Sequence, residues 1–152
     1  MSKHFFLVTL VTLTAHSLTQ AQSIAAEPQQ FVGVWTLINA DPKEAPSLLT
    51  IHADGTFTTS QVAGGGNTAI HGIWVPTSER SMRLTGRWLA GDNKTFKFIG
   101  TAKITGTVVL SSSNTFNAQT IVEGFNAAGQ PLFKVPSRVR GLRVTFDATP
   151  KN

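Results

Sequence analysis

Cysteine is absent from this chain of 152 residues. Its absence excludes disulfide bonds, thiol nucleophiles and cysteine-ligated metal centres. Histidine is almost as scarce, because only His52 and His71 follow the first 21 residues. Two isolated histidines provide fewer ligands than zinc or iron requires. The sequence therefore predicts no metal site and no cofactor.

The motifs that mark nucleophilic and phosphate-binding sites are also missing. No Gly-x-Ser-x-Gly segment precedes a helix, and the glycine run at 63–67 lacks the lysine and the helix of a phosphate loop. The net charge is +5, but the basic residues are scattered along the chain rather than clustered. This scatter is typical of a solvated surface, so we expect no nucleic-acid partner.

Long hydrophobic runs are few. The apolar run Phe5–Leu13 follows Lys3 and precedes small residues that end at Ala21, which is the layout of a secretory signal peptide. We therefore expect residues 1–21 to be a signal peptide, cleaved after Ala21 or after Ala25, and the mature protein to be secreted or periplasmic. A buried N-terminal helix is the alternative. No later run approaches the roughly 18 residues of a membrane helix, so the mature chain should have no integral membrane segment.

From Phe31 onward, the chain shows a regular alternation of apolar and polar residues. The alternation is clearest in Thr95–Ser111, where the odd positions are mostly polar. The even positions are Phe96, Phe98, Gly100, Ala102, Ile104, Gly106, Val108 and Leu110. This pattern predicts a strand with one buried face, on which Phe96 and Phe98 point inward.

Shorter strands with the same period are separated by turn residues at regular spacing. We expect them at Phe31–Ile38, Leu48–Ala53, Thr56–Val62, Ile70–Pro76, Ser81–Leu89, Thr115–Phe125 and Leu132–Phe146. Short hairpin connections, such as Asp54-Gly55, allow only antiparallel neighbours. Closure removes exposed edges, so the sequence predicts an all-β domain, a single eight-stranded antiparallel up-and-down barrel. We assign it to residues 31–147, after a flexible mature N-terminus at 22–30 and before a tail at 148–152.

The segment Gly33-Val34-Trp35 resembles the Gly-x-Trp signature of the calycins, the lipocalin-like barrels. The stretch Ile51–Trp74 and the run Gly100–Thr107 look like segments of a group of small bacterial lipocalin-like barrels. The resemblance implies that Trp35 closes one end of the barrel and that an arginine of the last strand packs across its ring. The candidates on that strand are Arg138, Arg140 and Arg143.

Large side chains on the expected inner faces form the candidate ligand site. An eight-stranded barrel encloses either a packed core or one small ligand, and the sequence does not decide between them. The candidate ligand-binding residues are Trp74, Trp88, Phe96, Phe98, Phe116, Met82 and His71.

Two titratable residues are candidates for chemistry. The strand around His71 is apolar on both faces, so the direction of this side chain is open, and an inward imidazole would be a weak candidate for a catalytic base. Glu123 shares its face with Asn117 and Gln119 and is expected on the outer surface. A reversed register would instead bury its carboxyl group and raise the pKa.

The function favoured by these patterns is sequestration or transport of a small hydrophobic molecule by an exported lipocalin-like barrel. One alternative is a cofactor-independent isomerase or cyclase, since similar barrels such as the allene-oxide-cyclase-like proteins act mostly by shaping a bound substrate. A structural envelope protein with a filled core is the third hypothesis. The oligomeric state and the identity of the ligand stay open.

Overall fold

The computed structural model of the protein describes residues 28–41, 43–60 and 66–145. The expected signal peptide at 1–21 and the tail at 148–152 lie outside these residues. Among the described residues, no helix is both long and apolar enough to cross a membrane.

Eight strands follow a single turn of 3-10 helix, η1 (Pro28–Gln30). The strands are β1 (Gly33–Asn39), β2 (Ser47–Ile51), β3 (Thr56–Ser60), β4 (Ile70–Ser78), β5 (Ser81–Gly91), β6 (Phe98–Ser112), β7 (Thr115–Asn126) and β8 (Pro131–Arg143). Each strand pairs with the next in antiparallel fashion, and β8 pairs with β1 to close the sheet. The prediction of a single eight-stranded antiparallel up-and-down barrel is therefore confirmed.

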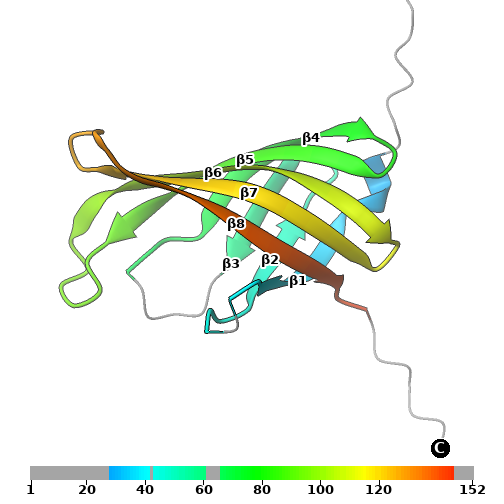
Figure 1. The fold of residues 1–152 in the computed structure, drawn as a ribbon, viewed down its shortest axis with the longest axis horizontal. Coiled ribbons are helices and arrows are strands. Elements are labelled where there is room, and N and C mark those ends of the chain that lie inside the picture. Colours follow the sequence, from blue (N-terminus) through cyan, green and yellow to red (C-terminus); the bar gives the residue numbers. More distant parts are fainter. Residues whose placement is uncertain (1–27, 42, 61–65, 146–152) are drawn as a thin grey trace, which may run out of the picture.

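The strands are unequal in length. Strands β2 and β3 have 5 residues each, whereas β6 has 15 and β8 has 13. Figure 1 shows the consequence, because the hairpins β5–β6 and β7–β8 extend well past the ends of β1, β2 and β3 on the left of the view. The sheet is therefore longer on the side of β5 to β8 than on the side of β1 to β3.

The other end of the barrel is closed by aromatic side chains. Trp35 is fully buried, and its ring lies 4.9 Å from that of Phe116. Phe31 follows η1 and packs against Trp74, with 6.0 Å between the ring centroids. The indole Nε1 of Trp35 donates a hydrogen bond to the carbonyl oxygen of Phe31 at 2.9 Å. This contact fixes the segment after η1 across the end of the barrel.

Three glycines on the inner face each face an aromatic ring on the neighbouring strand. Gly72 pairs with Phe57, Gly141 with Phe116, and Gly124 with Phe133. A Cβ atom at Gly141 would lie 2.2 Å from the ring of Phe116. The missing side chains let the rings lie flat on the sheet, an arrangement that accommodates strong strand curvature.

The expected strand at Thr95–Ser111 begins later than the sequence indicated. The carboxylate of Asp92 accepts hydrogen bonds from the backbone N–H groups of Lys94 and Thr95, and the N–H of Phe96 donates to the carbonyl oxygen of Asp92. These bonds stabilise a turn in which Phe96 has φ of 55°. The alternation expected from position 95 applies only from Gly100 onward.

Candidate functional site

The barrel encloses a cavity of about 750 Å³. Its wall is predominantly apolar and comes from all eight strands. The inward side chains that line it are Leu37, Leu49, Phe57, Thr59, Ile70, Leu84, Trp88, Ile104, Val108, Phe116, Ala118, Thr120, Val122, Ser137 and Val139. A volume of this size falls in the range of sites for small molecules.

Several of the inward side chains are only half buried. They are Leu37, Leu84, Trp88, Ile104 and Val139. All five pack against the core and line the cavity. Inward apolar side chains that keep accessible surface show that the interior is not filled by the protein's own residues. The part of the interior next to these five side chains is therefore accessible.

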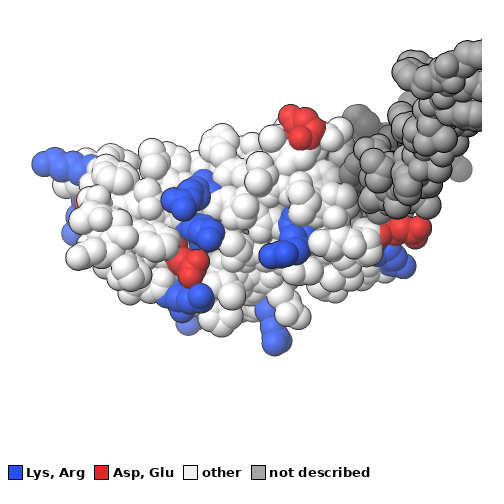
Figure 2. Space-filling view, turned by 90° about the horizontal axis from the view of Figure 1, so that it is seen from above, with Lys and Arg blue, Asp and Glu red and all other residues white. Residues whose placement is uncertain are grey.

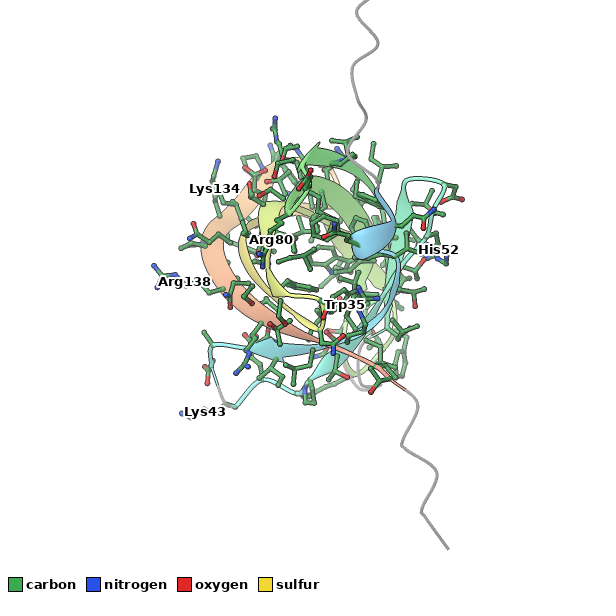
Figure 3. All side chains as sticks on the ribbon, turned by 90° about the vertical axis from the view of Figure 1, so that its right-hand side faces the viewer. Trp35, Lys43, His52, Arg80, Lys134 and Arg138 are labelled. Carbon is green, nitrogen blue, oxygen red and sulfur yellow. The ribbon has the colours of Figure 1, made fainter. Side chains whose placement is uncertain are left out.

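The mouth of the cavity lies at the end where β1 finishes. Asp41 and Glu44, in the connection from β1 to β2, line it together with Arg138 of β8. Figure 3 shows the Arg138 side chain projecting away from the barrel, in contrast to Trp35, which lies within the ring of strands. The rim of the cavity therefore carries charges of both signs.

The polar side chains of the cavity wall carry hydroxyl groups, except for the amide of Asn39 at the end of β1. Thr59 and Thr120 are each 6% exposed and belong to opposite sides of the barrel, on β3 and β7. The Oγ1 atom of Thr120 donates to the carbonyl oxygen of Ser137 over 3.4 Å. The Oγ1 atom of Thr59 is buried and has no hydrogen-bond partner among the described residues.

Of the seven candidate ligand-binding residues, Trp88 and Phe116 line the cavity. Trp74 and Met82 are buried in the core but do not line it. The indole Nε1 of Trp74 donates to the carbonyl oxygen of His52 at 3.0 Å, which holds this ring towards the closed end. Trp74 and Met82 therefore belong to the core that supports the cavity wall.

The burial expected for Phe96 and Phe98 is not found. Their exposed fractions are 74% and 54%, and neither side chain lines the cavity. Phe96 belongs to the turn formed around Asp92, and Phe98 is the first residue of β6, opposite Gly91 at an irregularity in the register. The apolar alternation of β6 therefore does not continue into the turn that contains Phe96.

His71 is exposed and points away from the cavity. Its neighbours Ile70 and Gly72 have the inward phase of β4, because Gly72 lies opposite Phe57 and Ile70 lines the cavity. The pocket-facing orientation considered for His71 is therefore wrong. His71 therefore cannot act as a catalytic base on a molecule inside the cavity.

Glu123 lies on the outer face, as expected. It pairs with Lys134 in the register of β7 and β8, and their side chains form an ion pair of 3.0 Å. Within the described residues, no three potential metal ligands come together.

Arg143, rather than Arg138 or Arg140, packs on Trp35. Its guanidinium donates hydrogen bonds to the carbonyl oxygens of Ser113 (2.9 Å), Val32 (2.8 Å) and Gln30. The assignment of Arg138 and Arg140 to the end of the barrel is corrected by the register, which pairs Trp35 with Arg143.

The glycine of the Gly-x-Trp segment has a steric role beside this arginine. Gly33 has φ of +135°, and a Cβ atom there would lie 2.8 Å from a guanidinium nitrogen of Arg143. Glycine at this position therefore leaves room for the arginine.

Sequence reasoning missed the cavity residues Thr59, Leu37 and Ile70. The inward direction of Thr59 could have been predicted, because Thr59 lies two positions after Phe57 and therefore shares its face on β3. A threonine in an alternating pattern does not show whether its hydroxyl will find a partner.

The outer surface shows no concentration of positive charge on the face seen in Figure 2, where lysine and arginine side chains are interrupted by uncharged surface. Comparisons of the chain with known protein families, with curated proteins and with solved structures found no match.

Proposed function

We propose that this protein is an exported, lipocalin-like carrier that binds a small hydrophobic molecule inside its barrel for sequestration or transport. The observation that carries the proposal is the ring of half-buried apolar side chains around the cavity of about 750 Å³. A bound apolar molecule would remove this surface from water, which contributes about 25 cal/mol per Å². Trp88 and Phe116 supply flat aromatic surface for the ligand.

Carriage is favoured over isomerisation by the position of the titratable groups. His71 and Glu123, the two candidates for acid–base chemistry, point outward. The charged residues that line the cavity, Asp41, Glu44 and Arg138, belong to its mouth. A ligand held deep in the barrel would therefore contact hydroxyl groups and apolar side chains.

The neutral fluorophore N-phenylnaphthylamine, whose emission rises in apolar surroundings, tests the proposal. We expect saturable binding to the purified protein. Val122→Trp places a large side chain in the cavity, whereas Ile121→Trp places the same side chain on the outer face. Val122→Trp should weaken binding at least about tenfold, and Ile121→Trp should leave it unchanged.

Thermal unfolding of both variants shows whether each one is folded. Absence of saturable binding to the wild-type protein, or equal affinity of a folded Val122→Trp variant, would contradict the proposal. Native mass spectrometry of protein purified from its own host gives the class of the natural ligand, because a co-purifying molecule adds a defined mass.

A further inference from the structure

The buried hydroxyl of Thr59 is the one polar side-chain atom inside the described part of the barrel that lacks a hydrogen-bond partner. A buried hydroxyl without a partner is costly, and native proteins leave few of them unexplained. Thr59 lines the cavity, and rotation about its Cα–Cβ bond can bring the hydroxyl into the position that the methyl group occupies. A ligand oxygen in the cavity can therefore provide the missing partner.

The surroundings of Thr59 limit the kind of oxygen. The residues that pair with it are Leu49 and Ile70, which are apolar and buried. No lysine, arginine or histidine side chain is among the inward residues of the cavity wall. An ionised carboxylate held beside Thr59 would lose its hydration without gaining a counter-charge.

The mouth carries charges of both signs, because Lys43 belongs to the same connection as Asp41 and Glu44. Asp41 and Glu44 are both exposed residues of the rim. Arg138, the basic residue of the rim, is on the outer phase of β8 and projects away from the barrel (Figure 3). A carboxylate ligand would therefore find no cation in the interior and no net positive charge at the mouth.

We propose that the ligand carries an uncharged oxygen, a hydroxyl or carbonyl group, which hydrogen-bonds to Thr59 while its apolar body packs against Trp88, Ile104 and Phe116. This inference rests on the proposed function and adds the class of ligand, which is a neutral alcohol or ketone rather than a fatty acid. The bond would form only in the complex, so it gives selectivity among ligands of equal apolar area.

Displacement of N-phenylnaphthylamine by dodecane, dodecanol and dodecanoate tests the inference at pH 8, where the carboxylate is ionised. Dodecanol should bind the wild-type protein at least about tenfold more tightly than dodecanoate. Thr59→Val keeps the shape of the side chain and removes the hydroxyl. It should weaken dodecanol about tenfold and leave dodecane unaffected.

Thr58→Val is the matched control, because Thr58 is the preceding residue of β3 and has the outward phase. It should leave all three affinities unchanged. Equal affinity of dodecanol for the wild-type protein and Thr59→Val overturns the inference, as does equal affinity of dodecanol and dodecanoate for the wild type. Failure of dodecane and dodecanol alike to displace the probe would instead refute the proposed function, and this inference with it.

Discussion

The guanidinium carbon of Arg143 lies 4.1 Å from the centroid of the Trp35 ring. This contact joins the last strand of the barrel to the first, and the three carbonyl oxygens bound by the guanidinium belong to Ser113, Val32 and Gln30. One side chain therefore connects the β6–β7 turn, η1 with the segment after it, and Trp35 at the closed end of the barrel. Burial lowers the pKa of Arg143, but an arginine remains charged throughout the physiological range.

Arg143→Lys should lower the free energy of unfolding by about 2 kcal/mol, because lysine keeps the charge but loses the planar group that stacks on Trp35 and binds several carbonyls. Urea unfolding followed by circular dichroism measures the change. Arg140→Lys, on the exposed outer face, is the control and should stay within about 0.5 kcal/mol of the wild type. Equal stability of the two variants would show that the contact with Trp35 contributes little.

Gly141→Ala should destabilise the protein by about 2 kcal/mol, because the new methyl group would meet the ring of Phe116 and force it off the sheet. The double variant Gly141→Ala, Phe116→Leu separates this clash from a general loss of packing. If the clash is the cause, the two changes together should cost less than the sum of the single changes. Strictly additive changes in the free energy of urea unfolding would contradict the clash.

Thr59→Val should raise the stability of the ligand-free protein by about 1 kcal/mol, since it replaces an unpaired buried hydroxyl by a methyl group of the same size. Thermal unfolding measures the change, with Thr58→Val as the reference on the outer phase of the same strand. A loss of stability in Thr59→Val would mean that the hydroxyl already has a partner in the free protein.

Stability should fall in acid partly through Asp54. The hydroxyl and the backbone N–H of Thr56 bind its carboxylate at 2.6 and 2.9 Å and hold the pKa below the ordinary value of 3.8. A carboxyl group with a lowered folded-state pKa contributes stability above the unfolded-state pKa, and this contribution is lost as the pH falls through the folded-state value. Asp54→Asn should therefore reduce the loss of stability below about pH 4. Identical pH profiles of wild type and variant in urea unfolding would contradict this.

Trp88 should report ligand binding by its fluorescence. It is half buried in the cavity wall, whereas Trp35 and Trp74 are buried in the core and do not line the cavity. A bound apolar molecule should shift the emission of the wild type to shorter wavelength. Trp88→Phe should remove this shift while N-phenylnaphthylamine still binds, and a shift that persists in the variant would place the ligand elsewhere.

The barrel could be predicted from the sequence because the alternation of apolar and polar residues and the short hairpins are local features. The prediction was inaccurate where a single side chain ends the alternation. The side chain of Asp92 stabilises a turn that moves Phe96 and Phe98 to the surface. At His71 the flanking residues were apolar on both faces, so only the pairing of Gly72 with Phe57 could set the direction.

The choice among the arginines and the importance of Thr59 also depended on information that is not local. The register of β1 on β8 selects Arg143 as the partner of Trp35. The hydroxyl of Thr59 lacks a partner because Leu49 and Ile70 flank it across two strands. Neither relationship can be seen in a stretch of adjacent residues.

The pairing of β1 with β8 also has a consequence for folding. Trp35 contacts a residue roughly a hundred positions later in the chain, and the wall of the cavity includes residues from both of these strands. Such distant contacts form slowly, since the whole intervening chain must be ordered before they stabilise it. A nascent chain still lacking β8 would therefore have no enclosed interior, and the barrel could close only once synthesis has passed Arg143.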